Sequence, residues 1–219
     1  MSSRELAISS ALEFFDAGGF RDRLAALVAI PSTMQDPAFE ADVWRYLHEA
    51  IAPWVTRMGF TATIHPNPRA GFGPIMVAER IEDSSYRTVL TYGHGDTVRG
   101  LDEQWDEGLK PWELNERGDR WYGRGTADNK GQHATHLTAL EHVLAARGGK
   151  LGFNLKLVLE MSEERGSPGL KEFVAGHARE LAADVLIASD GPRVAAAIPT
   201  VTEPVITRVG KGATALFGV

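Results

Sequence analysis

The sequence predicts an α/β domain with a mixed, mostly parallel sheet that is covered by helices. Segments with helical spacing of apolar residues alternate with short β-type runs along the 219 residues, and such alternation is typical of a sheet with helices packed on it. Three β-type runs, at 89–92, 155–159 and 185–188, are short and strongly apolar, as expected of buried strands. These observations predict one core with strands at its centre.

The N-terminal half is expected to be helical and then to enter the sheet. Apolar residues recur at helical spacing in 7–15 and again in 20–28, with a break at residues 17–19 and an end at Pro31. A further helix is predicted at 41–58, kinked or divided at Pro53 and ended by Gly59. Short strands are predicted to follow at 61–65, 75–79 and 89–92, separated by turn-forming residues.

The C-terminal half begins with a long polar loop at 100–120. This loop holds Trp105 and Trp112, which either line a substrate entrance or anchor the loop on the core. A helix is predicted at 131–146, ended by two glycines, and a strand at 153–159, a helix at 168–181 and a strand at 185–188 come after it. The second half therefore continues the alternation that defines the fold class.

Composition and charge exclude several classes of partner and of metal ligand. The net charge of −6, without a basic run, argues against nucleic acid as a partner. No apolar run approaches the roughly 20 residues that cross a bilayer, and the first residues carry Glu5 where a secretory signal needs a basic start, so a cytoplasmic protein is expected, with no membrane partner. The absence of Cys leaves His, Asp and Glu as the strong candidate metal ligands.

Residues that bind metals follow each of the three apolar runs. His94 and Asp96 follow the first run, Glu163 and Glu164 the second, and Asp190 the third. In open α/β sheets ligands bind beyond the carboxyl ends of the strands, so residues that lie far apart in the sequence can converge there. The sequence therefore predicts a metal site made of one imidazole and several carboxylates.

A further acid, Asp128, lies in the glycine-rich stretch 123–131, where glycine lets the backbone turn sharply. A carboxylate with two oxygens can bridge two divalent ions about 3.5–4 Å apart. Asp96 can accept a hydrogen bond from the imidazole of His94, since alternate strand residues point the same way. The adjacent acids Glu163 and Glu164 can diverge, one toward a metal and the other toward an attacking water.

Each of these residues also has an ordinary explanation. Asp190, before a glycine, is typical of a turn, and a pair of glutamates is typical of a solvated loop. His133 and His136 are three apart on a predicted helix, which favours surface or packing positions over a second metal site. Lys130 pairs either with a carboxylate of the site or with solvent, and the sequence leaves both open.

Several motifs in a fixed order carry a family resemblance: YGHGDT at 92–97, WYGRG at 121–125, DNKG at 128–131, SEERGS at 162–167 and SDG at 189–191. In these segments the chain resembles the zinc-dependent aminoacylase, glutamate carboxypeptidase and succinyl-diaminopimelate desuccinylase peptidases, with details similar to the carnosinase-like dipeptidase branch. The resemblance implies a dinuclear hydrolase that cleaves an amide bond of a dipeptide, a C-terminal residue or an N-acyl amino acid. Two Zn²⁺ ions are implied, with Co²⁺ or Mn²⁺ as alternatives.

The resemblance also assigns a role to each candidate residue. It implies that His94 and Asp190 hold one zinc ion, that Glu164 holds the second and that Asp128 bridges both. Glu163 is implied as the general base, and Asp96 as the support of His94. A small peptide or N-acyl amino acid is the implied substrate, and a homo-oligomer is possible.

The resemblance divides the chain near residue 203. Residues 1–203 are expected to form the N-terminal part of the catalytic domain, and residues 204–219 the start of a truncated dimerisation or lid domain whose first strand has no partner. Family members continue further and supply a final His ligand. Two hypotheses follow: a dinuclear hydrolase, or a truncated, catalytically incompetent fragment that binds at most one metal well.

Overall fold

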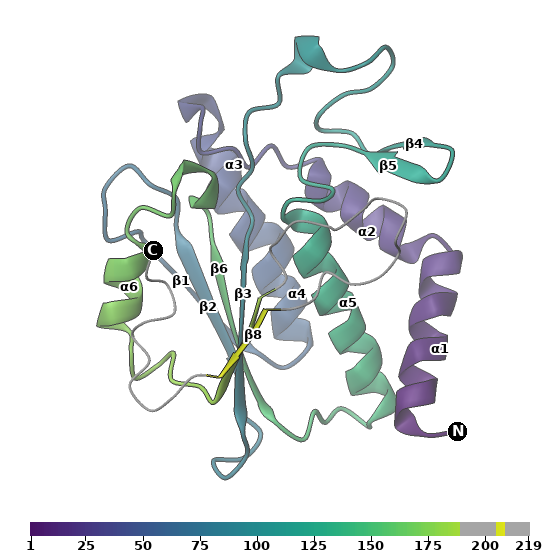
Figure 1. Cartoon of the computed structure of the whole chain (residues 1–219), viewed down its shortest axis with the longest axis vertical. Coiled ribbons are helices and arrows are strands. Elements are labelled where there is room, and N and C mark those ends of the chain that lie inside the picture. Colours follow the sequence, from purple (N-terminus) through teal and green to yellow (C-terminus); the bar gives the residue numbers. More distant parts are fainter. Residues whose placement is uncertain (189–204, 209–219) are drawn as a thin grey trace.

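The computed structural model describes residues 1–188 and 205–208 (Figure 1). The α-helices and the one π-helical segment, η2, are α1 (Ser3–Asp16), α2 (Gly19–Val28), α3 (Glu40–Arg45), η2 (Tyr46–Ile51), α4 (Ala52–Arg57), α5 (Lys130–Ala146) and α6 (Leu170–Gly176). The strands are β1 (Thr61–His65), β2 (Ile75–Arg80), β3 (Thr88–His94), β4 (Asn115–Arg117), β5 (Arg120–Tyr122), β6 (Asn154–Glu160), β7 (Val185–Ala188) and β8 (Val205–Arg208). Short 3-10 turns are η1 (Pro37–Phe39), η3 (Asp102–Gln104) and η4 (Glu163–Arg165).

Six strands form one sheet in the order β1-β2-β6-β3-β7-β8. The predicted α/β class with a mixed sheet is confirmed, but the parallel part is restricted to the centre. Strand β3 pairs in parallel with β6 and β7, whereas β1 with β2, β2 with β6 and β7 with β8 are antiparallel. The expectation of a mostly parallel sheet is wrong for the outer strands. At one edge, β1 and β2 follow each other along the chain without a crossover helix, and strands connected in this way pair antiparallel.

Helices cover both faces of the sheet (Figure 1). Met76, Leu157 and Leu159 point to one face and join a core with residues of α3, η2, α4 and α5. Ile75, Val77 and Val158 point to the other face, where α6 supplies Leu170 and Phe173. Alternate strand residues thus enter separate cores, which holds the pairing in one register.

The predicted N-terminal helices are present as α1 and α2. Ser2 and Glu5 form a capping box that fixes the start of α1, and Gly18, at φ 83°, allows the turn between the helices. The predicted helix at 41–58 is observed as α3, η2 and α4 in succession. Pro53 lies in the first turn of α4, where a proline needs no amide hydrogen, so the helical path continues to the stop at Gly59.

Three segments differ from the sequence-based expectations. The polar loop at 100–120 contains 3-10 helix η3, and it ends in a hairpin, β4 and β5, that turns at Gly118 with φ 63°. The helix expected at 168–181 is only α6, with His177 as its C-cap. The expectation that the strand after residue 204 lacks a partner is wrong for its described part. Strand β8 pairs along β7 and satisfies backbone groups at that edge.

Among residues 1–188 and 205–208, no helix has the length and hydropathy that crossing a bilayer requires. Residues 189–204 and 209–219 lie outside the described part of the chain. The expectation that a second domain starts at residue 204 therefore stays a prediction.

Candidate metal centre

Strands β3 and β6 bring the first candidate residues to one edge of the sheet. The two strands run in parallel and end level with each other, since His94 is the register partner of Glu160. The chain then leaves β6 into the 3-10 turn η4, which carries Glu163 and Glu164. The carboxyl ends of neighbouring parallel strands thus place these residues together, as the fold class predicts.

The His94 side chain is fully buried, and acceptors lie at both ring nitrogens. Its Nδ1 is 3.0 Å from the backbone oxygen of Asp96 and 3.4 Å from the Asp96 carboxylate. Its Nε2 is 3.0 Å from Oδ1 of Asp128 and 3.7 Å from the Glu163 carboxylate. The ring is therefore oriented through Nδ1, and Nε2 points at two carboxylates.

Asp96 joins the two strand ends. One of its buried oxygens accepts from the amide of Glu163 at 3.0 Å, and the other accepts from the amide of Glu164 at 3.1 Å. Asp96 therefore fixes the backbone that carries both glutamates and also contacts the ring of His94. A carboxylate that orients a histidine in this way raises its basicity as a ligand.

The loop before α5 carries Asp128. Its neighbour Asn129 is buried, and the Asn129 side-chain oxygen lies 3.3 Å from the His94 backbone amide, which donates to it. The peptide bond between Asp128 and Asn129 is cis. Gly131 lies in the first turn of α5, directly against the carbonyl oxygen of Thr126. The loop is thus closely packed on both sides of Asp128.

Gly131→Ala is expected to lower the free energy of unfolding by about 1–3 kcal/mol, because a Cβ at this position would collide with the Thr126 carbonyl oxygen. Since backbone must move to relieve the collision, the position of Asp128 is expected to change as well. Urea unfolding measures the first effect. Gly176→Ala is the matched control: it lies in α6 with open space around it, and alanine there should be neutral or stabilising by up to about 1 kcal/mol.

The charges of this centre fit a bound cation. Burial lowers the pKa of His94, but hydrogen bonds to Asp128 and Asp96 outweigh it and raise the pKa to about 11. Burial, together with the negative charge of Asp128, raises the pKa of Glu164 to about 7. The hydrogen bond with His94 lowers the pKa of Asp128. The positive charge that several acids favour at His94 can be replaced by a metal ion, and imidazole with carboxylates is a donor set that suits divalent transition ions.

The sequence allowed Lys130 to pair with a site carboxylate or with solvent. The ammonium is fully buried and contacts neither solvent nor any site carboxylate within residues 1–188. Its buried ammonium donates to the backbone oxygens of Leu27 at 3.0 Å and Ile30 at 2.6 Å. Burial lowers the pKa of Lys130 to about 7. Lys130 thus attaches the end of α2 to the start of α5, beside Asp128. No sequence signal identified these carbonyl partners.

His133 lies behind the centre and is buried, in agreement with the packing role favoured for it. Its Nε2 is 2.6 Å from the hydroxyl of Tyr46, and its Nδ1 is 3.3 Å from the side-chain oxygen of Asn129. Burial lowers the pKa of His133 to about 3. Tyr46 and His133 together hold Asn129, which in turn contacts the backbone of His94.

The lowered pKa of His133 gives a pH prediction. The folded protein binds fewer protons at this ring than the unfolded chain between pH 6.5 and about 3, so stability is full above pH 6.5 and falls as the pH drops through that window. His133→Gln is expected to reduce the loss between pH 7 and pH 4.5 by an amount on the order of 1–3 kcal/mol. Urea unfolding at both pH values measures it, and an unchanged pH dependence would contradict this assignment.

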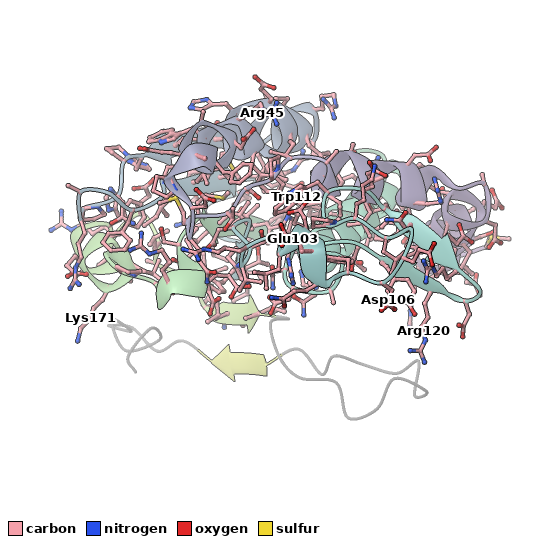
Figure 2. The ribbon with its side chains drawn as sticks, turned by 90° about the horizontal axis from the view of Figure 1, so that it is seen from above. Arg45, Glu103, Asp106, Trp112, Arg120 and Lys171 are labelled. Carbon is pink, nitrogen blue, oxygen red and sulfur yellow. The ribbon has the colours of Figure 1, made fainter. Side chains whose placement is uncertain are left out.

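The two tryptophans of the loop have different positions. Trp105 donates from Nε1 to the backbone oxygen of Gly100 at 2.7 Å, so it anchors its own loop. Trp112 lines a surface cavity together with Phe39 and Arg99. Figure 2 labels Trp112 and Glu103 near its centre, whereas Asp106 and Arg120 of the same loop lie toward its lower right. Loop anchoring is therefore observed for Trp105, and a substrate entrance at Trp112 stays a prediction.

Five of the six candidate residues come together in the structure: His94, Asp96, Asp128, Glu163 and Glu164. The sixth, Asp190, lies outside the described residues. The roles of all six stay predictions.

Residues 90–214 match peptidase family M20/M25/M40, a segment that includes every candidate residue. The chain belongs to this family. Among curated members, it is 40% identical over 161 residues to the cysteinylglycine-S-conjugate dipeptidase of Corynebacterium striatum, covering 71% of this chain and 34% of that protein. It is 30% identical over 171 residues to a Cys-Gly metallodipeptidase of Candida albicans, covering 73% of this chain and 35% of that protein.

The family fold is also present in solved structures. Human carnosine dipeptidase 1 superposes with a TM-score of 0.75 and 27% identity, over 85% of this chain and 41% of that one. The chain spans about a third of the length of the curated M20/M25/M40 relatives named above, which are 34% and 35% covered. The family match and the similarity to these dipeptidases confirm the resemblance to metal-dependent peptidases and to their carnosinase-like branch.

Proposed function

We propose that this chain carries the metal centre of a hydrolase that cleaves the amide bond of a dipeptide. The observation that supports this most directly is the convergence of His94, Asp128 and Glu163 at the carboxyl ends of β3 and β6. A buried imidazole that faces two carboxylates is poorly explained by packing, because buried charges need compensation. Family membership supplies the reaction class.

The proposed ligands of a dinuclear Zn²⁺ centre are His94, Asp128, Glu164 and Asp190, with Asp128 shared by both ions. When bound, the ions supply Lewis acidity, which makes a water acidic and polarises the amide carbonyl. His94 would present Nε2 as its ligand atom, since Nδ1 already faces the backbone oxygen of Asp96. Co²⁺ and Mn²⁺ suit the same oxygen and nitrogen donors.

Glu163 is the proposed general base. Its carboxylate lies beside His94 Nε2, and its backbone amide is bound to Asp96, so it reaches the centre from a fixed backbone. In this position Glu163 takes a proton from the attacking water and delivers it to the departing amine. Asp96 is a positioning residue, because it acts through His94 and the two glutamates.

Dipeptides are the first substrate class to test. One similar relative is named for S-conjugates of cysteinylglycine and a second for Cys-Gly. A third, from mouse, is a Beta-Ala-His dipeptidase that is 38% identical over 103 residues. Acetylornithine deacetylases are 29–31% identical to this chain, which keeps N-acyl amino acids as the second class.

Metal stoichiometry with turnover tests the proposal. The protein is purified without chelator, its metal content is measured by elemental analysis, and hydrolysis of Cys-Gly, β-Ala-His and N-acetyl amino acids is assayed with added Zn²⁺. About two ions per chain with turnover would support the dinuclear hydrolase. One ion or none, without turnover, would overturn it and favour the metal-poor, inactive alternative.

A further inference from the structure

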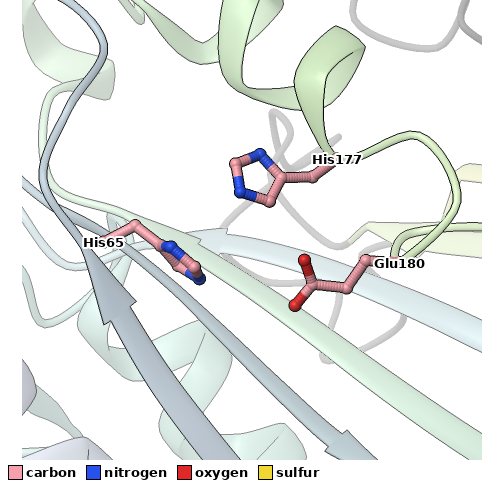
Figure 3. A group of neighbouring side chains, drawn as sticks. All are labelled: His65, His177 and Glu180. Atoms are coloured by element: carbon pink, nitrogen blue, oxygen red, sulfur yellow. The ribbon is translucent and has the colours of Figure 1, made fainter.

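A second group of metal-ligating side chains lies between β1 and the end of α6. His65 ends β1, His177 is the C-cap of α6, and Glu180 follows in the next turn. One ligand atom of each lies within 4.8 Å of the others. Figure 3 shows the three side chains converging on one point from these elements.

The imidazole of His177 is prepared to act as a ligand. Its Nδ1 lies 2.8 Å from the backbone oxygen of Phe173, one turn earlier in α6. Nδ1 therefore carries the proton and donates it, which leaves the lone pair on Nε2 free to bind. Histidines that bind metals are held in this way, through a hydrogen bond from the other ring nitrogen to a carbonyl.

The imidazole of His65 contributes a buried nitrogen to this cluster. Its Nε2 is buried and has no hydrogen-bond partner among the described residues. A buried ring nitrogen without a partner is costly, and such an atom calls for a bound water or ion. His65 thus gives a second observation, independent of His177, that a ligand belongs here.

Ring packing explains part of this arrangement. Phe173 stacks on His177 with 3.9 Å between ring centroids and meets His65 edge-on at 5.3 Å, while the two histidine rings lie 4.9 Å apart. Phenylalanine or leucine would fill the same space. Packing therefore does not account for two imidazole nitrogens and a carboxylate that point at each other.

The backbone holds Glu180 in reach of the histidines. The amide of Leu181 donates to the oxygen of His177 at 2.9 Å, which continues the helical turn, and Lys156 from β6 donates to the backbone oxygens of Glu180 and Ala182. Residues three apart in such a turn are neighbours, so the carboxylate of Glu180 lies beside the ring of His177. Its rotatable side chain can close the remaining distance.

This cluster is separate from the candidate metal centre. Across the sheet His65 pairs with Ile75, Ile75 with Glu160, and Glu160 with His94. Three strand spacings of about 4.8 Å place the two histidines roughly 14 Å apart. Ions of one dinuclear centre lie only about 3.5–4 Å apart, so the two sites cannot share a pair.

We propose that His65, His177 and Glu180 form an additional Zn²⁺ site that links the edge strand β1 to α6. Two imidazoles and one carboxylate are an established zinc donor set and leave a fourth position for water. Zinc–nitrogen bonds of about 2.0–2.1 Å require ligand atoms about 3.4 Å apart in a tetrahedral site. The present separations of up to 4.8 Å therefore contract by a little over 1 Å on binding.

Zinc titration followed by long-range ¹H–¹⁵N spectra of the imidazoles tests the proposal on the chelator-stripped protein. The chain has seven histidines, so each ring can be assigned with single His→Ala variants. The Nε2 signals of His65 and His177 are expected to shift together to the metal-bound position. The same shift is expected in Asp128→Ala, in which the candidate metal centre is disabled, so failure at one site is distinguishable from failure at the other.

Equilibrium dialysis with Zn²⁺ then compares two matched variants, each made in the Asp128→Ala protein. Adding Glu180→Gln, which keeps the size of the side chain, is expected to weaken zinc binding at least tenfold, in line with the loss of a ligand. Adding Glu49→Gln, at an exposed glutamate of η2, is expected to leave the zinc affinity unchanged. Unshifted His65 and His177 at saturating zinc, or equal affinity in both variants, would overturn the proposal.

Discussion

Glu163→Gln is expected to lower kcat for dipeptide hydrolysis by about 100- to 10,000-fold while the metal content of the protein stays the same. Glutamine preserves the size of the side chain but cannot take a proton at neutral pH. The Glu163 carboxylate lies 3.7 Å from His94 Nε2. The hydrogen bond to Asp96 is donated by the backbone N–H of Glu163, so the substitution leaves that contact in place. Steady-state kinetics with elemental analysis measures both effects.

Two comparisons make this result specific to Glu163. Glu49→Gln, on the exposed surface of η2, is expected to keep full activity. Glu164→Gln is expected to lose metal as well as activity, because Glu164 is the proposed ligand of the second ion. Activity in Glu163→Gln within about threefold of the unmodified protein would rule out Glu163 as the general base, since a general base contributes far more than that.

Asp128→Ala is expected to lose the metal of the candidate centre, with an affinity reduced by at least about 100-fold. Asp128 is the proposed shared ligand, so its removal weakens the binding of both ions. Even the loss of a residue that only orients a ligand lowers metal affinity by about 10–100-fold. Asp119→Ala is the matched control, because the Asp119 side chain is 97% exposed in the turn between β4 and β5. Elemental analysis after dialysis against a weak chelator measures the difference.

The metal-free form of Asp128→Ala provides a second measurement. The hydrogen bond to Asp128 raises the pKa of His94, so its removal is expected to lower that pKa from about 11 toward the ordinary range. An NMR titration of the His94 ring measures the change. A metal content equal to that of Asp119→Ala, or a His94 ring that titrates as before, would contradict the role proposed for Asp128.

Tertiary contacts explain why some sequence-based expectations for the fold were wrong. The edge position of β8 was missed because strand pairing depends on which edge of the sheet is free, and the sequence does not record this. The shortness of α6 was missed because the apolar spacing continues to Leu181, which packs in the same core from beyond the end of the helix. Hydrophobic spacing reports burial, and it leaves the backbone conformation open.

The sequence by itself determined the α/β class and the family, and it identified the acids and the histidine that the structure brings together. It could do so because chemistry in such sheets gathers at strand ends, where His94 and Glu163 lie. Only the tertiary structure decided which buried groups support them. The partners of Lys130 lie 100 and 103 residues away, and Tyr46 lies 87 residues from His133. Likewise, His65 and His177 meet only because α6 packs over the sheet, and no local pattern encodes a contact across the fold.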